Sequence, residues 1–243
     1  MSVNYKPAIH FQHVDFHIGD IEILKDITGS FPQGRITTLV GPSGAGKSTL
    51  LKLCNGLISP VNGEIFVKDK AIADYEPVEL RRMVGMALQS APMINGTVYE
   101  NLNLPLSLQG QELAKADALE LLEDVGLKGD LLERKVKDLS GGQRQKVSIA
   151  RTLVNKPEIL LMDEITSSLD RASKLEVEEL ISKINRKYKT TIIWITHNLQ
   201  QALEIGDYTW VMMDGQVIET GESSLLEDPK DPRAMEFVKG VVS

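Results

Sequence analysis

Two kinds of hydrophobic pattern divide the chain into predicted strands and helices. Near the amino terminus, apolar and polar residues alternate over 9–18 and again over 22–31, with a two-residue turn between them. Alternation with a period of two indicates strands with one buried face, so we expect an antiparallel β edge here. A second hairpin is predicted where Asp214 and Gly215 separate two further apolar runs, because Asp-Gly is a favoured two-residue hairpin turn.

Continuous apolar runs predict a second group of strands. Residues 36–40, 159–162 and 191–196 are short and rich in aliphatic and β-branched side chains, as in strands that are buried on both faces. Helical spacing over 171–188 separates the last two runs. This alternation predicts a parallel α/β sheet, and polar residues that follow its strands are expected at the edge where such sheets bind ligands.

The middle of the chain has a different pattern. Apolar residues recur at helical spacing over residues 90–155, which we interpret as a helical subdomain inserted into the α/β core. No repeat, low-complexity tract or Gly-rich linker marks a boundary between independent domains. We therefore expect one domain over 1–243, with the core and an antiparallel β subdomain over 1–89 and 156–243.

Composition narrows the possible functions. The chain of 243 residues carries 27 Lys plus Arg against 34 Asp plus Glu, a formal net charge of -7, without the basic face that nucleic acid needs as a main partner. No apolar stretch reaches the ~18 residues of a membrane span, and the amino terminus lacks the apolar core of a secretory signal. The single Cys54 has no intrachain partner for a disulfide. We expect a cytoplasmic protein.

A glycine-rich segment follows the strand at 36–40 and opens a helix. It fits the pattern G-x-x-x-x-G-K-[ST], whose glycines let successive backbone N–H groups turn toward phosphate oxygens. The helix terminus adds partial positive charge, Lys47 is expected to reach the β and γ phosphates, and Ser48 offers a hydroxyl to Mg²⁺. The predicted phosphate-binding residues are Gly41, Pro42, Ser43, Gly44, Ala45, Gly46, Lys47, Ser48 and Thr49.

Two acids follow the strand at 159–162. Asp163 is expected to hold Mg²⁺, and Glu164 is placed to polarise an attacking water. Acids are common at strand ends, so the pair becomes informative only because the phosphate-binding loop precedes it. Together the two motifs predict a nucleoside triphosphatase that uses ATP and Mg²⁺.

A third motif, Leu139-Ser140-Gly141-Gly142-Gln143, resembles the signature of ATP-binding cassette (ABC) ATPases. Other marks of that family follow in order: Gln89 resembles the Q-loop glutamine, residues 167–170 the D-loop, and His197 the switch histidine. The resemblance covers essentially the whole chain. It implies a P-loop NTPase fold with a RecA-like core, an antiparallel β subdomain and a helical subdomain.

The resemblance also implies roles for individual residues. Glu164 would be the catalytic carboxylate, with Lys47 on the phosphates. His197 would contact the γ-phosphate and orient Glu164 and the water, Gln89 would sense Mg²⁺ and the water, and Asp170 would couple two ATP sites.

Two cassettes of this family pair head to tail, which gives the signature its task. The loop at 41–49 already holds the phosphates from one side, so the signature residues of the same chain would have to serve another nucleotide. Each γ-phosphate would lie between the loop of one copy and the signature of the other, in a two-fold dimer with two composite sites. The residues implied on the second side are Ser140, Gly141, Gly142 and Gln143.

One position departs from the family pattern. An aromatic residue usually stacks on adenine two positions beyond a residue like Phe16, and here that position is Ile18. An apolar side chain can cover the ring but has no π face, so stacking of about 1 kcal/mol is expected to be lost. Phe16 or His17 could substitute if the register slips. We expect weaker discrimination between bases than in typical relatives.

His13, Asp15 and His17 alternate along the first predicted strand. A metal site on that face is conceivable. No further ligand or supporting residue is evident in the sequence, so a solvated strand face is the favoured interpretation.

The resemblance implies that a partner does the transport. An integral membrane permease would dock a cytoplasmic helix beside Gln89, against residues 92–104, and hold this chain on the inner face of the cell membrane. The stretches 50–65, 91–111 and 160–170 are similar to the putative iron-export ATPases of the Fet type.

Alternatives to iron or metal export remain open. Importers of phosphate or amino acids have a similar ATPase half, and soluble assembly ATPases of the Suf iron–sulfur type carry the same motifs at similar length. A purely regulatory nucleotide switch is disfavoured, because Glu164 and His197 are both present.

Overall fold

The structure is a computed structural model that describes residues 5–242. Its smaller sheet is antiparallel, in the order β2-β1-β4-β5, and consists of β1 (Pro7–Ile18), β2 (Ile21–Pro32), β4 (Asn62–Val67) and β5 (Lys70–Ala71). β1 and β2 pair from Pro7 with Pro32 to Ile18 with Ile21, which confirms the first predicted hairpin. Phe11 of this sheet is fully buried against Trp210 of the larger sheet.

The larger sheet has six strands in the order β10-β9-β3-β8-β7-β6. The strands are β3 (Ile36–Val40), β6 (Val84–Ala87), β7 (Ile159–Asp163), β8 (Thr191–Ile195), β9 (Tyr208–Met213) and β10 (Gln216–Glu222). All neighbours are parallel except β9 and β10, which form the predicted hairpin around Asp214-Gly215. The parallel strands therefore end at one edge, where β7 and β8 finish in register at Asp163 and Ile195.

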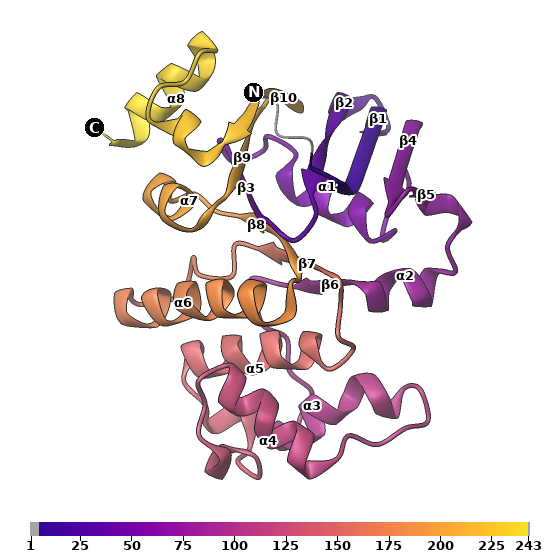
Figure 1. Cartoon of the computed structure of the whole chain (residues 1–243), viewed down its shortest axis with the longest axis vertical. Coiled ribbons are helices and arrows are strands. Elements are labelled where there is room, and N and C mark those ends of the chain that lie inside the picture. Colours follow the sequence, from indigo (N-terminus) through magenta and orange to yellow (C-terminus); the bar gives the residue numbers. More distant parts are fainter. Residues whose placement is uncertain (1–4, 243) are drawn as a thin grey trace.

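Helices surround this sheet, and α3, α4 and α5 lie together at one end of the molecule, opposite α8 (Figure 1). They are α1 (Lys47–Cys54), α2 (Pro77–Met83), α3 (Val98–Ser107), α4 (Lys115–Asp124), α5 (Gly141–Leu153), α6 (Arg171–Tyr188), α7 (Leu199–Ile205) and α8 (Pro232–Val242). Short 3₁₀ turns occur at Ile72–Asp74, Gly129–Leu131, Val136–Asp138 and Ser223–Leu226. The α/β fold class predicted from the sequence is confirmed, with α3, α4 and α5 in the stretch expected to be helical.

One apolar cluster connects the helical end to the sheet. It contains Leu122 of α4, Val147 of α5, Val177 of α6 and Trp194 of β8, all fully buried. Burial of such side chains is the main favourable term in folding, at roughly 1.5–3 kcal/mol for each large aliphatic residue. α5 packs against both α6 and β6, so the helical end shares its core with the sheet. The division into subdomains at 90–155 stays a prediction.

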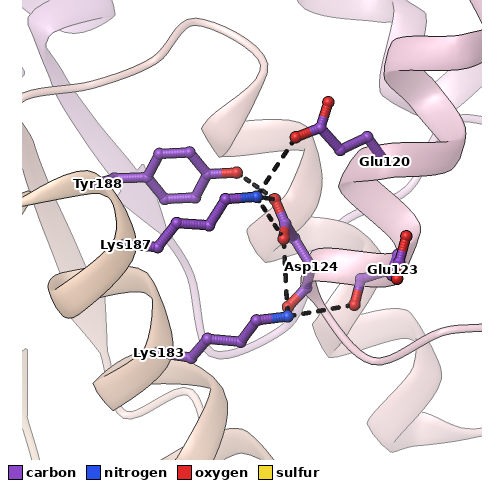
Figure 2. Close-up of polar contacts among 6 residues, drawn as sticks. All are labelled: Glu120, Glu123, Asp124, Lys183, Lys187 and Tyr188. Atoms are coloured by element: carbon purple, nitrogen blue, oxygen red, sulfur yellow. Dashed lines mark hydrogen bonds and ion pairs between the residues drawn. The ribbon is translucent and has the colours of Figure 1, made fainter.

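A polar cluster also joins α4 to α6 (Figure 2). The carboxylate of Asp124 is only 8% exposed and accepts hydrogen bonds from Lys187 Nζ at 2.7 and 2.6 Å and from the Tyr188 hydroxyl. Lys183 donates to the backbone carbonyl of Asp124 at 3.1 Å, and Lys187 also pairs with Glu120 at 3.3 Å. Each charge in this Asp124 cluster thus has a partner.

These contacts alter the pKa of Asp124. Burial alone would raise that pKa, because a carboxylate loses hydration in the interior. The hydrogen bonds from Lys187 and Tyr188 and the charges of Lys187 and Lys183 outweigh burial, so the pKa of Asp124 lies below its ordinary value. The pKa of Lys187 is raised, chiefly by its hydrogen bond to Asp124.

The three alternating polar residues of β1 each make a hydrogen bond. His13 Nδ1 lies 2.7 Å from Asp26 Oδ1, His17 Nδ1 lies 2.9 Å from the Gly19 carbonyl, and Asp15 accepts from the backbone N–H of Asp26 at 2.7 Å. Over residues 5–242, no three His, Cys, Asp or Glu side chains come together as a metal-binding group. The interpretation of these residues as a solvated strand face stays a prediction.

Candidate nucleotide-binding site

A glycine loop connects the carboxyl end of β3 to the start of α1. Gly41 has φ +143°, and a Cβ there would lie 2.0 Å from the Met212 carbonyl oxygen. Gly46 has φ +94°, and its Cβ would lie 2.9 Å from the Ile23 carbonyl oxygen. Only glycine fits these positions without distortion. The loop is therefore pressed between β2 and β9, with its backbone held in a conformation that side chains disfavour.

The start of α1 is an open anion site. Gly46 occupies the N-cap position, and no side chain caps the helix there. The amides of the first helical turn lack intrahelical partners and carry the positive end of the helix dipole. A phosphate group suits such a terminus, so the loop fits the ligand that the sequence motif predicts.

Lys47 lies under the glycine loop. Its side chain is buried, and Nζ donates to the carbonyls of Gly41 at 2.7 Å and Pro42 at 2.8 Å. Burial lowers the pKa of Lys47, and the negative charges of Glu164 and Asp163 act in the opposite direction. The ammonium group is thus placed on the loop and faces the acids at the end of β7.

Ser48 and Asp163 form a hydrogen-bonded oxygen pair. Ser48 Oγ donates to Asp163 Oδ1 at 3.0 Å. Burial raises the pKa of Asp163, the hydrogen bond from Ser48 lowers it, and the charge of Glu164 raises it, with a net upward shift. A cation beside this carboxylate would offset the cost of its burial. Hydroxyl and carboxylate oxygens are ligands that Mg²⁺ prefers, so this pair fits the predicted metal.

Glu164 and His197 face one another across the ends of β7 and β8. Glu164 Oε1 lies 2.6 Å from His197 Nε2. Glu164 has φ +49°, a left-handed conformation that is uncommon outside glycine and is concentrated at functional sites. Its backbone N–H donates to the Ile195 carbonyl at 3.3 Å. The two residues form a carboxylate–imidazole pair on the same edge as Lys47.

Gln89 reaches this edge from the end of β6. Its Nε2 donates to Ser167 Oγ at 2.9 Å, and Ser167 Oγ in turn donates to the Glu164 carbonyl at 2.9 Å. The structure thus brings together Gln89, Glu164 and His197, as the sequence predicts, around the ends of three neighbouring strands. Ser167 was missed as an individual site residue, although it lies inside the predicted D-loop.

The signature residues occupy a different part of the surface. Ser140 is the N-cap of α5, where its Oγ accepts from Gln143 N while Gln143 Oε1 accepts from Ser140 N. Gly142 lies close to α6, because a Cβ there would be 2.8 Å from Ser173 Oγ. A cavity of about 490 Å³ opens at this helix terminus, and its lining contains no residue of 41–49. The signature residues thus line a cavity that the glycine loop does not reach.

Asp170 has a structural task in the chain. It is the N-cap of α6, and its carboxylate accepts from Ser173 N at 3.0 Å and Ser173 Oγ at 2.8 Å. The backbone hydrogen bond from Ser173 is the largest of the contacts that lower the pKa of Asp170. This cap fixes the start of the helix that packs against α5. A coupling role for Asp170 stays a prediction.

Ile18 lies at the tip of the β1–β2 hairpin. It pairs with Ile21, and the two side chains are 64% and 70% exposed. The same hairpin contacts the glycine loop, because Ile23 and Leu24 lie against Gly46. An exposed apolar tip beside a phosphate-binding loop suits a flat apolar base. The adenine contact of Ile18 stays a prediction.

The fold and these residues define a class of protein. A parallel α/β sheet with a G-x-x-x-x-G-K-[ST] loop at a helix terminus, beside Asp163 and the Glu164–His197 pair, is a P-loop nucleoside triphosphatase. Comparisons with known proteins then place it more narrowly. The family model described as "ABC transporter" matches residues 24–167.

Two curated relatives cover most of the chain. The putative ABC transporter ATP-binding protein YjkB of Bacillus subtilis is 46% identical over 220 residues, which span 90% of this chain and 87% of the relative. Phosphate import ATP-binding protein PstB 3 of Natronomonas pharaonis is 34% identical over 245 residues, 96% of this chain and 88% of the relative.

Solved structures of cassettes superpose on the same fold. The structure of cbiO1 from Clostridium perfringens, part of the ABC transporter complex cbiONQ, has a TM-score of 0.83 with 27% identity, covering 92% of this chain and 91% of that one. A dimer of the cassette MJ0796 with ADP and Pi bound has a TM-score of 0.76 with 29% identity, covering 88% and 98%. The chain belongs to the ABC transporter family, as an ATP-binding and ATP-hydrolysing subunit.

Proposed function

We propose that two copies of this chain bind ATP between them and, through its hydrolysis, power a separate membrane permease. The observation that carries this proposal is the Glu164–His197 pair, 2.6 Å apart, on the same edge as the glycine loop and the Ser48–Asp163 pair. Such an edge can bind a triphosphate and activate a water, which are the two needs of hydrolysis.

Binding is assigned to the loop and the oxygen pair. Backbone amides of 41–46 and the ammonium of Lys47 hold the β and γ phosphates, and Ser48 and Asp163 hold Mg²⁺. Bound Mg²⁺ neutralises charge that develops on the phosphate oxygens. The shift of Lys47 toward the phosphates requires its hydrogen bonds to Gly41 and Pro42 to be exchanged for bonds to the ligand.

Glu164 is assigned to the attacking water. Its second carboxylate oxygen is available to accept a proton from water while His197 holds Oε1. Gln89, held by Ser167 next to the Glu164 backbone, lies beside the same water position. Positioned general bases contribute about 10²–10⁴-fold to a rate, so Glu164 is the residue whose loss should cost most.

A second copy is needed to complete the site. In one chain the start of α5 opens to its own cavity, which shares no residue with the glycine loop. Two head-to-tail copies would place Ser140–Gln143 of each against the phosphates held by the other, since that helix terminus also suits an anion. Support comes from MJ0796, a structural neighbour that is dimeric with ADP and Pi bound. Asp170 caps the start of α6 beside Ser173, which lies against Gly142 of the signature, and would couple the two sites through this contact.

We propose that the partner powered by ATP hydrolysis is a membrane permease. None of the described helices is long and apolar enough to cross a bilayer. Leu88 and Ile94 expose apolar side chains on either side of Gln89, which supports docking of a permease helix along residues 92–104. This contact would hold the chain on the cytoplasmic face of the membrane.

We propose two candidate cargoes for the permease. The likeness of 50–65, 91–111 and 160–170 to Fet-type proteins favours export of iron or another metal. Phosphate import is the second candidate, because the relatives named PstB 3 match 34% and 36% of aligned positions. Both candidates share the ATP chemistry and differ only in the permease.

The first experiment uses the variant Glu164→Gln to identify the partner protein. With ATP and Mg²⁺, this variant is expected to hold the assembled complex, and its purification from detergent-solubilised cells should recover one multi-span protein. Recovery of soluble proteins only would favour an assembly ATPase of the Suf type instead.

Cargo is tested in cells that lack the native gene. Restoration of iron efflux by the wild-type chain, but not by Glu164→Gln, would support export. Restored uptake of labelled phosphate with unchanged iron content would support import, and no change in either would contradict both cargoes.

A further inference from the structure

Two side chains of helix α5 bond to the backbone near Gln89, one before that residue and one after it. Arg151, in the last turn of α5, donates from Nη2 to the Pro92 carbonyl at 2.6 Å. Gln145, earlier in the same helix and buried, donates from Nε2 to the Leu88 carbonyl at 3.3 Å. The position of Gln89 is thus bracketed by two contacts from one helix.

Arg151 is an unusual choice for a purely structural contact. Burial lowers the pKa of its guanidinium, and no carboxylate offsets this effect among the described residues. Its acceptors are uncharged: the Pro92 carbonyl and, at 3.4 Å, Asn101 Oδ1. Arg151 is only partly buried, so its charge keeps some contact with water. What a planar guanidinium does offer is a fixed fork that can hold two acceptors in one geometry.

Asn101 extends this hold along the segment. It is fully buried, and its Oδ1 accepts from Ile94 N at 3.0 Å. Its Nδ2 donates to the carbonyls of Ile94 at 3.1 Å and Thr97 at 2.9 Å. Side chains of α3 and α5 therefore hold the backbone between Leu88 and Thr97 at several points. A shift of this segment would break one or more of these hydrogen bonds.

The other end of the chain of contacts reaches the proposed catalytic carboxylate. Gln89 bonds Ser167, and Ser167 bonds the backbone of Glu164. Gln89 precedes Pro92 by only three residues. A shift of the Pro92 carbonyl would therefore displace Gln89 as well. Displacements of about 1 Å can cost 10²-fold in rate when reacting groups are misplaced.

We propose that Arg151 is a positioning residue for ATP hydrolysis, which fixes the Gln89 segment through the Pro92 carbonyl and thereby sets the Gln89–Ser167 contact beside Glu164. Arg151 itself touches no nucleotide or water in this account. The proposal rests on the roles proposed above for Gln89 and Glu164, and it does not depend on the transported cargo.

The first test compares kinetic constants of three variants. Arg151→Gln should lower kcat for ATP about tenfold and change KM less than twofold, since the phosphate-binding loop is untouched. Arg151→Lys keeps a donor for Pro92 but not the fork, so kcat should recover to within about threefold of wild type. Arg186→Gln is the matched control. Within the described part of the chain, that guanidinium bonds only the Ser182 carbonyl of its own helix, so the variant should leave kcat unchanged.

A double-mutant cycle with Gln89→Ala shows whether Arg151 acts through Gln89. If it does, Arg151→Gln should lower kcat less than twofold further in the Gln89→Ala background. Two full, multiplicative losses would overturn the proposal, as would wild-type kcat in Arg151→Gln. Wild-type kcat in Gln89→Ala would instead overturn the role of Gln89 and this proposal with it. Equal loss in Arg151→Lys and Arg151→Gln would indicate damage to the fold rather than positioning, and would also overturn it.

Discussion

The molecule contains two clusters of charged groups that differ in how completely they are paired. In the Asp124 cluster, the carboxylate is 8% exposed and meets Lys187, Tyr188 and Lys183 (Figure 2). At the carboxyl ends of β7 and β8, the Glu164 carboxylate meets His197 through one oxygen and has no other side-chain partner among residues 5–242, and no side chain caps the start of α1. The first cluster pairs its buried carboxylate on both oxygens, and the second leaves one oxygen of Glu164 and the amides of α1 for a ligand.

This difference distinguishes a structural contact between two helices, which we call a joint, from a site that can bind a ligand. Fully paired charges fix two elements relative to one another, here α4 and α6, and have no capacity left for a ligand. The left-handed backbone at Glu164 costs stability that the surrounding structure must offset. The uncapped amides of α1 and the second oxygen of Glu164 leave capacity to bind a ligand. The same residue types therefore serve structure in one place and chemistry in the other.

The largest expected effect is on hydrolysis. Glu164→Gln should lower kcat for ATP by about 10³-fold, because the amide accepts no proton from water. The free energy of unfolding in urea should stay within about 0.5 kcal/mol of wild type, as expected for a residue with few structural contacts. Steady-state phosphate release and urea titration measure the two quantities. Wild-type turnover would remove Glu164 from the chemistry.

Gly41→Ala should destabilise the loop by about 3 kcal/mol, since it combines a disfavoured φ with a clash against backbone. Its Cβ would lie 2.0 Å from the Met212 carbonyl oxygen. Gly110→Ala is the control: φ is +71° but no atom lies within 4 Å, so only about 1 kcal/mol is expected. Equal losses in the two variants would show that close packing of the loop is unimportant.

Asp124→Asn should lower the free energy of unfolding by about 1–3 kcal/mol at pH 7, because it removes a buried charge from partners that are themselves partly exposed. The folded pKa of Asp124 is lowered, so its stabilisation is present above the unfolded pKa of about 3.9 and is lost as pH falls through the folded value. The difference between wild type and variant should therefore shrink below pH 4. A difference that is constant with pH would contradict the ionic account of this joint.

Much of the fold could be predicted because it follows local patterns. Alternation gave the β1–β2 hairpin, Asp-Gly gave the β9–β10 turn, and aliphatic runs gave β3, β7 and β8. β4 and α7 were not predicted: the first three residues of β4 are all exposed, and α7 has only seven residues. Short elements with weak periodicity carry little signal of their own.

The site was predictable where motifs are contiguous. The loop at 41–49 and the pair Asp163-Glu164 are read directly from spacing, and family resemblance supplied Gln89 and His197. Arg151 and the Asp124 cluster were not found, because their partners lie far along the chain: Arg151 contacts Pro92, and Asp124 contacts Lys187. Such contacts depend on how helices pack, which a single sequence does not specify.

The smallest expected effect concerns binding of the adenine base of ATP. Ile18→Tyr adds an aromatic face at the exposed hairpin tip and should tighten ATP binding about fivefold, equivalent to roughly 1 kcal/mol of stacking. Competition between ATP and GTP, followed by fluorescent nucleotide displacement, measures both affinity and base preference. Ile21→Tyr, one strand across, is the matched control. Unchanged affinity in Ile18→Tyr would place adenine elsewhere.

The contrast between a complete joint and an incomplete site predicts that ATP completes the site by joining two chains. Light scattering during size-exclusion chromatography of Glu164→Gln tests this most directly. With ATP and Mg²⁺ the mass should double, with ADP it should remain that of one chain, and Ser140→Arg in the same background should abolish the doubling. A single-chain mass at saturating ATP, or doubling that survives Ser140→Arg, would contradict the account.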